Sequence, residues 1–282
     1  IKEHRSVRKF KDTPVPENVL NGILMAGTRA SNTGNMQVYS MVVTTSKELL
    51  EQLSPCHVGQ PASKAPVHIT FCADINRFSK WCEQRGAKPE YDNFAWFMNA
   101  ATDALLASQN VALEAEAHGL GICYLGTTIY TTERISEILR LPKGVIPVTV
   151  VTMGYPEAMP PLTDSLPLEA VVHRETYHDY TPEDIDLLWA ERESSDETAK
   201  LILVNELPHL ARLFHERRYT GMDNLSLSPG PRELSNKHAL FNQYHSHAHT
   251  RCTYTPGRCA RSSGRLPHHT LPARTYLSVH PQ

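Results

Sequence analysis

The sequence predicts a fold of the α/β or α+β class. Helical and strand patterns alternate along the chain, few tight hairpin turns are signalled, and one helical stretch is much longer than the others. The chain has 282 residues, of which 40% are hydrophobic. That composition can build a sizeable core in one large domain or two small ones, so wholesale disorder is not expected.

The longest helical pattern runs from Asp92 to His118, where apolar and small residues recur at spacings of three and four, and Gly119 ends it. Its many alanines allow neighbouring backbones to approach closely, so we expect it to be the central helix of the core. Shorter helices are predicted at residues 17–27, 47–53, 131–141, 182–193, 201–219 and 232–240. Strands are predicted at residues 39–45, 66–74, 120–126 and 145–155. Residues 76–90 lack a clean period and are interpreted as a surface excursion.

Charge and composition exclude several classes of partner. Lys and Arg together number 28 and Asp and Glu number 30, a formal charge of −2, which gives no general case for nucleic acid or membrane binding. No run of apolar residues is long enough to span a bilayer, and no signal-peptide pattern is visible. Four scattered cysteines without metal-binding spacing favour reduced thiols and a cytoplasmic location: Cys56, Cys72, Cys82 and Cys123.

The end of the chain differs in composition from the rest. Glu233 is the last acidic residue, and residues 244–282 hold Arg and His but no carboxylate. We therefore expect a domain over residues 1–243 and a basic tail over residues 244–282 that is disordered by composition. The tail offers metal-ligand types, but the six residues between Cys252 and Cys259 are not a zinc-finger spacing, so no metal site is predicted.

A basic cluster stands almost at the start of the chain, at His4-Arg5-Ser6-Val7-Arg8-Lys9. Guanidinium groups match phosphate oxygens bidentately, and a neighbouring hydroxyl adds a donor. Such a cluster can hold a phosphate monoester, although an isolated basic run is more often a solvated patch. The cluster alone does not decide between these readings.

Two further stretches are suited to a polar or flat ligand. Residues 31–37 (Ser-Asn-Thr-Gly-Asn-Met-Gln) form a loop of small polar residues, which can be a plain turn or can bring amides close to a ligand. The apolar strand that ends at Gly126 with hydroxyls after it can merely turn, or can let its backbone approach a flat ring. No GxGxxG after a strand, GxxxxGK[ST], HExxH or GxSxG motif occurs, which removes several standard enzyme classes.

Taken together and in order, these three stretches resemble the FMN-dependent nitroreductase family, and within it the NADPH-type nitro/flavin reductase branch. The matching motifs are His-Arg-Ser-x-Arg at residues 4–8, the loop at 31–37, and Gly-Leu-Gly-x-x-Tyr-Leu-Gly at 119–126. The resemblance covers about residues 2–242. It implies an α+β sandwich with a central mixed sheet, and an interlocked homodimer with two FMN sites at the subunit interface.

The resemblance also implies which residues bind FMN. His4, Arg5, Ser6 and Arg8 would contact its phosphate and ribityl chain, and Ser31, Asn35 and Gln37 would close over it, partly from the second subunit. Gln60 would contact the edge of the isoalloxazine ring, and the segment along the ring would be Tyr124, Leu125, Gly126 and Thr127. One departure stands out: the branch carries a Lys and an Arg where this chain has Thr163 and Ser165, which puts more weight on Arg5 and Arg8.

The implied activity is that of an FMN-dependent NAD(P)H oxidoreductase. NADPH or NADH would give a hydride to flavin N5, and a small-molecule acceptor (a nitroaromatic, a quinone or a flavin) would take it in a ping-pong scheme. No side chain is assigned a catalytic role. The alternatives that keep the fold are a related flavin enzyme that dehalogenates or destroys flavin, and a non-catalytic flavin-binding protein. An alternative of another class is a metal- or nucleic-acid-binding protein that works through the basic tail.

Overall fold

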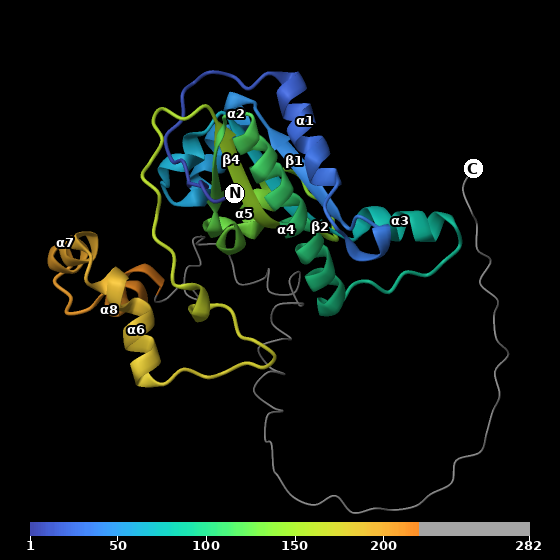
Figure 1. Cartoon of the computed structure of the whole chain (residues 1–282). Coiled ribbons are helices and arrows are strands. Elements are labelled where there is room, and N and C mark those ends of the chain that lie inside the picture. Colours follow the sequence, from blue (N-terminus) through green and yellow to red (C-terminus); the bar gives the residue numbers. More distant parts are fainter. Residues whose placement is uncertain (220–282) are drawn as a thin grey trace, which may run out of the picture. The chain divides into compact units, whose positions relative to one another are not determined.

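The computed structural model describes residues 1–219, and the side chains of residues 1–216 (Figure 1). The predicted helix at residues 232–240, the tail and the boundary at residue 243 lie outside these described residues. Of the helices that are described, none combines the length and the hydrophobicity that a membrane crossing requires.

Four strands form one sheet in the order β1-β2-β4-β3. Their bounds are β1 Tyr39–Thr44, β2 Val67–Asp74, β3 Gly121–Leu125 and β4 Val145–Gly154. All three pairings are antiparallel, with register partners such as Thr70 opposite Val150. Among the described residues, parallel pairing is limited to one isolated bridge between Ser6 and Ile122. We expected a mixed sheet, with both parallel and antiparallel pairing; in the described residues, only that bridge adds parallel pairing to the antiparallel strands.

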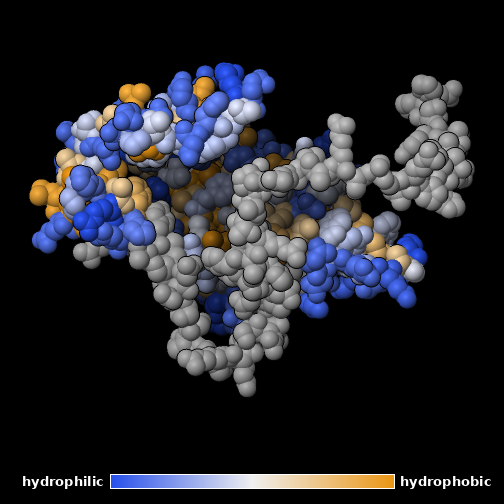
Figure 2. Space-filling model, turned by 90° about the horizontal axis from the view of Figure 1, so that it is seen from below, coloured by the Kyte–Doolittle hydropathy of each residue, from blue (hydrophilic) through white to orange (hydrophobic). Residues whose placement is uncertain are grey.

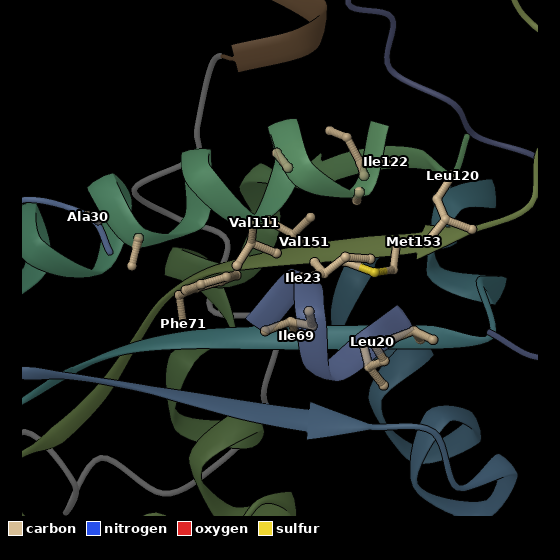
Figure 3. Packing of buried hydrophobic residues seen from close by; sticks show 14 of the residues in the cluster. Leu20, Ile23, Ala30, Ile69, Phe71, Val111, Leu120, Ile122, Val151 and Met153 are labelled. Atoms are coloured by element: carbon tan, nitrogen blue, oxygen red, sulfur yellow. The ribbon is translucent and has the colours of Figure 1, made fainter. Parts of the chain in front are cut away.

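One face of the sheet is covered by α1 (Glu17–Thr28) and α4 (Phe94–Ala117). Figure 3 shows Leu20 and Ile23 of α1 meeting side chains of β2 and β4 in the main hydrophobic core. The two helices come unusually close at Gly27, where an added Cβ would lie 2.6 Å from the Cγ2 atom of Val111. The alanine-rich helix predicted from the sequence is thus the central core helix.

Smaller elements cover the other face: α2 (Lys47–Leu53), α5 (Thr132–Ile138) and the short helices η2 (Ser54–His57), η3 (Pro61–Lys64) and η4 (Gly126–Tyr130). Because both faces are covered, every residue of β2 is buried. Short helix η1 (Thr33–Asn35) precedes β1, and α6 (Pro182–Glu193) begins with a capping box built by Thr181 and Asp184.

Two expectations about helices were wrong. Residues 76–90 are not an irregular excursion throughout, because Asn76–Gln84 form α3. Its apolar residues Phe78, Trp81 and Cys82 follow helical spacing, but the stripe is too short to stand out among polar neighbours. The helix expected over residues 201–219 is divided.

The separate pieces in that region are α7 (Asp196–Val204), α8 (Leu210–Leu213) and the π-helix η6 (Phe214–Tyr219). Glu206 adopts a φ of 53° after α7, and Pro208 cannot continue a helical hydrogen-bond pattern. The short helix η5 (Leu168–Ala170) lies in the long connection between β4 and α6.

Candidate functional site

The basic cluster is fixed alongside β3. The backbone N–H of Val7 donates to the carbonyl of Ile122 at 2.8 Å, and the Val7 side chain lies against the backbone of Gly121. A Cβ on Gly121 would stand 2.6 Å from the Val7 Cβ, so this close approach requires glycine. Phe10 forms a second bridge to Pro156. The cluster thus runs past β3 as an ordered edge segment.

A cavity of about 350 Å³ opens beside this segment. It is lined by Ser6, Arg8, Lys9 and residues 157–160. The Arg8 guanidinium makes one long hydrogen bond, 3.4 Å to the Ser6 carbonyl, so most of its donors remain available. Glu157 brings one carboxylate to the same wall, and the two cations outnumber it.

His4 and Arg5 lie outside this cavity lining. The Nδ1 atom of His4 is 2.6 Å from the Oε1 atom of Glu116, and Arg5 donates to the carboxylate and the carbonyl of Glu3 at 3.1 and 2.8 Å. Both side chains are therefore held by carboxylates in this structure. Lys9, which the predicted site omitted, lines the cavity instead.

The segment at the end of β3 presents backbone and one hydroxyl. Leu125 is fully buried, whereas Gly126 and Thr127 reach the surface. Nothing lies within 4 Å of the position of a Cβ on Gly126, so its backbone is open to a ligand. The Tyr124 hydroxyl is tied to Ser108 of α4 at 2.9 Å, and burial raises the pKa of Tyr124.

Gln60 directly precedes η3, which packs against the same part of β3. The turn before it is tight, with φ values of 53° at Val58 and 70° at Gly59. The Gln60 carbonyl accepts hydrogen bonds from both the backbone N–H and the hydroxyl of Ser63, at 2.9 and 2.8 Å. Ala62 of η3 packs with the side chains of β3. The Gln60 turn, the basic cluster and residues 124–127 thus gather around one strand.

The loop at residues 31–37 lies at the opposite edge of the sheet. It leads into β1, and three inter-strand steps, about 14 Å, separate β1 from β3. Asp103 accepts from the backbone N–H and the hydroxyl of Thr33, and Arg77 donates to the carbonyl of Gln37. Asn35 and Gln37 adopt positive φ values of 54° and 50°. One chain therefore does not bring Ser31, Asn35 and Gln37 to the other predicted site residues.

A second cavity, of about 590 Å³, adjoins this loop and is lined by Gly34, Asn35, Met36, Arg77, Phe78 and Trp81. Its aromatic wall belongs to α3, the helix that the sequence pattern did not reveal. Figure 2 shows hydrophobic residues scattered among polar ones on the face it draws. No group of three or more potential metal ligands occurs among the described residues.

Comparison with known proteins places these features in a family. The model of the Nitroreductase family matches residues 1–155. The chain is 32% identical to a Bacillus subtilis (strain 168) protein named FMN reductase (NADPH), over 63% of this chain and 73% of that one. It is 34% identical to the oxygen-insensitive NADPH nitroreductase of Salmonella typhimurium, over 62% of this chain and 71% of that one.

Among solved structures, a crystal structure of a Bacteroides fragilis NCTC 9343 protein is 47% identical, with a TM-score of 0.77. The match covers 79% of this chain and 91% of that one. The sequence motifs, the helix-flanked antiparallel sheet and these matches agree. The chain belongs to the nitroreductase family.

Proposed function

We propose that the chain is an FMN-dependent NAD(P)H oxidoreductase that reduces nitroaromatics, quinones or flavins. Family membership supports the reaction class, and the names of the two relatives support the cofactor and the reductant. The observation that carries the proposal is the cavity beside β3, because Ser6, Arg8 and Lys9 meet there with free donors for a phosphate monoester.

The residues around β3 fit FMN as a group. The cationic cavity suits the phosphate end, and the exposed backbone at Gly126 and Thr127 suits the edge of a flat ring. Gln60, on the turn packed against β3, would supply a side-chain amide to the same ring. Bound FMN would supply the hydride chemistry, accepting from NADPH or NADH and passing to the acceptor in a ping-pong sequence.

The protein's part in this scheme is to bind and orient. Backbone N–H groups near the ring can stabilise negative charge that develops on it, and the held geometry brings donor and acceptor within reacting distance. His4 and Arg5 would add hydrogen-bond donors for the FMN phosphate. For this they would leave their carboxylate partners Glu116 and Glu3, or be oriented by them toward the phosphate. No nucleophilic side chain is required.

Lys9 compensates for part of the charge that this chain lacks. The branch cations expected at residues 163 and 165 are replaced by Thr163 and Ser165. Lys9 and Arg8 line the cavity together, so two positive charges remain at the phosphate end. Their combined attraction would hold FMN through a mainly electrostatic, salt-sensitive contact.

A homodimer would complete the site. Ser31, Asn35 and Gln37 lie across the sheet from β3, so they would close over the FMN of a second copy rather than their own. The connection and helices after β4 also carry apolar side chains with little cover, including Leu187 at 77%, Leu203 at 77% and Val204 at 81% exposure. Burial of such residues against a second copy would remove this apolar surface from water.

Residues 1–243 would form the catalytic domain and residues 244–282 an appended basic tail that activity does not need. A cytoplasmic location fits the four buried cysteines, all of them unpaired among the described residues.

The deciding experiment is the visible spectrum of the purified protein. We expect a yellow protein with one FMN per chain, bleached under anaerobic conditions by NADPH and reoxidised by a nitroaromatic or quinone. Truncation after Asn242 should leave this behaviour intact. Colourless protein that FMN cannot reconstitute would refute the proposal. Flavin that binds but is not reduced by either nucleotide would identify a non-catalytic flavin-binding protein. Release of halide from a halogenated substrate, with electrons supplied by the reduced flavin, would identify a dehalogenating relative.

A further inference from the structure

The face of β2 turned away from α1 and α4 carries a buried pair of imidazoles. Ile69 and Phe71 point into the main core, so their neighbours His68 and Thr70 point to the opposite face. The ring of His57, from η2, lies edge-on to the ring of His68, with centroids 6.0 Å apart and an interplanar angle of 70°. His57, His68 and Thr70 are all 0% exposed.

The imidazole pair connects two parts of the proposed FMN site. The Nδ1 atom of His57 lies 3.1 Å from the hydroxyl oxygen of Thr127. The Nε2–H of His68 donates to the carbonyl of Ser63 at 3.1 Å, and the Ser63 hydroxyl donates to the carbonyl of Gln60. The two rings therefore stand between the Gln60 turn and the segment that begins at Gly126.

Three buried polar atoms of this group have no partner among the described residues: His57 Nε2, His68 Nδ1 and Thr70 Oγ1. Because a carbonyl can only accept, His68 carries its proton on Nε2 and presents a bare acceptor at Nδ1. Apolar side chains at these positions would avoid the desolvation cost of two imidazoles, so packing alone does not account for the pair.

Both imidazoles are neutral at physiological pH, because burial lowers the pKa of His57 and of His68 to about 4. Neutral rings can each donate from one nitrogen and accept at the other, as a bridge between two neutral groups requires.

We propose that His57 is a positioning residue, which together with His68 holds the Thr127 hydroxyl, and hence the Gly126–Thr127 backbone, in register with the Gln60 turn. The bridge fixes the edge of the site against which the FMN ring is bound. This inference rests on the proposed function for its ligand and on the contacts of this chain for its geometry.

A double-mutant cycle between His57 and Thr127 tests the bridge, with FMN affinity measured by fluorescence quenching at pH 7.5. His57→Leu is expected to weaken FMN binding about 3- to 10-fold, the loss typical of one hydrogen bond. His57→Asn places an amide near the position of Nδ1 and is expected to keep the affinity within about 2-fold. In a Thr127→Val background, His57→Leu is expected to cause almost no further loss.

Cys56→Ala is the matched control, because Cys56 is a buried neighbour in η2 whose side chain packs with Leu53 and Ile135. It should lower the melting temperature and leave FMN affinity unchanged. Equal losses from His57→Leu in the wild-type and Thr127→Val backgrounds would mean that His57 acts only through packing, and would overturn the inference. Where His57→Leu does not fold, His57→Gln, whose amide reaches toward Nε2 rather than Nδ1, takes its place.

Amide hydrogen exchange in the FMN-free protein provides a readout that needs no flavin. His57→Leu should speed exchange at residues 127–130 and 60–63 and leave β2 and β4 as protected as in the wild type. Unchanged exchange in both segments would overturn the bridge even if FMN binds. Protein that shows the exchange effect but binds no FMN would refute the proposed function and leave the bridge standing.

Discussion

Asp103 holds Thr33 through a single carboxylate oxygen, which accepts from the backbone N–H at 2.9 Å and from the hydroxyl at 3.0 Å. Asp103 is 1% exposed, and its other oxygen has no partner among the described residues. A helix in the middle of the core thus anchors a surface loop at the edge of the sheet. The loop that would close over the flavin of a second copy is therefore anchored to the folded core.

Asp103→Ala should destabilise the protein by about 2–3 kcal/mol, because it leaves the half-buried N–H and hydroxyl of Thr33 without their acceptor. Asp103→Asn keeps an acceptor oxygen and should cost about 1 kcal/mol. Urea unfolding of the two variants beside the wild type measures the difference. Equal costs for both substitutions would show that Oδ1 is not the anchor of the loop.

Arg8→Ala should weaken FMN binding about 10- to 100-fold, the loss expected of a charge-assisted contact, with little change in stability. Lys9→Ala should have a smaller effect of the same sign, and Arg5→Ala should also cost FMN occupancy, less than Arg8→Ala because Glu3 already engages Arg5. Titration with FMN at low and high salt measures these losses, which should shrink as salt rises. The control is Arg134→Ala, an exposed guanidinium paired with Glu137. Full flavin occupancy in both the Arg5 and Arg8 variants would contradict the assignment of this cluster.

Gly121→Ala should destabilise the protein by about 1–3 kcal/mol, since its Cβ would overlap the Val7 side chain and push the basic cluster away from β3. FMN affinity should fall with it. Gly22→Ala is the matched control: Gly22 lies within α1, nothing stands within 4 Å of its Cβ position, and alanine there should stabilise the helix by about 0.5–1 kcal/mol. Thermal unfolding with and without FMN separates the two. Unaltered stability in Gly121→Ala would mean that the edge segment can shift without loss.

Acid should destabilise this fold through His57 and His68. Burial lowers the pKa of both from 6.5 to about 4, so between those values the unfolded chain binds more protons than the folded one. The free energy of unfolding is therefore expected to be unaffected by these groups above pH 6.5 and to fall by up to about 3 kcal/mol for one such histidine as pH drops to 4.

Urea midpoints measured from pH 7.5 to pH 4 test this dependence. The double variant His57→Gln, His68→Gln removes both titrating groups and should show a flatter profile across that window. If the stability of the double variant fell as steeply with pH as that of the wild type, groups other than His57 and His68 would cause the acid sensitivity.

The sequence predicted the core of the fold well in the elements where buried residues recur at regular spacing. The central helix and the four strands were located to within a few residues, since alternation in strands and three- or four-residue spacing in helices reflect burial directly. Residues 76–84 were missed because α3 buries a single short stripe. Residues 201–219 were wrongly predicted as one helix, although Pro208 is a visible helix breaker next to the turn at Glu206.

The candidate site could be predicted only in part. Ordered motifs indicated which stretches matter, and the structure gathers residues 4–8, Gln60 and residues 124–127 around β3. Sequence could not reveal that Glu3 and Glu116 hold Arg5 and His4, because these contacts depend on side-chain geometry. The His57–His68 pair was also missed, because a histidine on a strand or a short turn carries no periodic signal and its burial follows from tertiary packing alone. The predicted FMN contacts stay predictions until a ligand is bound.

Because Cys72 on β2 is buried, the reactivity of its thiol reports on the opening of the sheet. Cys72 is 0% exposed, and burial raises the pKa of its thiol to about 12. It therefore offers almost no reactive thiolate to an alkylating reagent while the strand stays covered. Its labelling rate, followed by peptide mass spectrometry, would time the separation of β2 from its covering helices, without any added fluorophore or engineered cysteine.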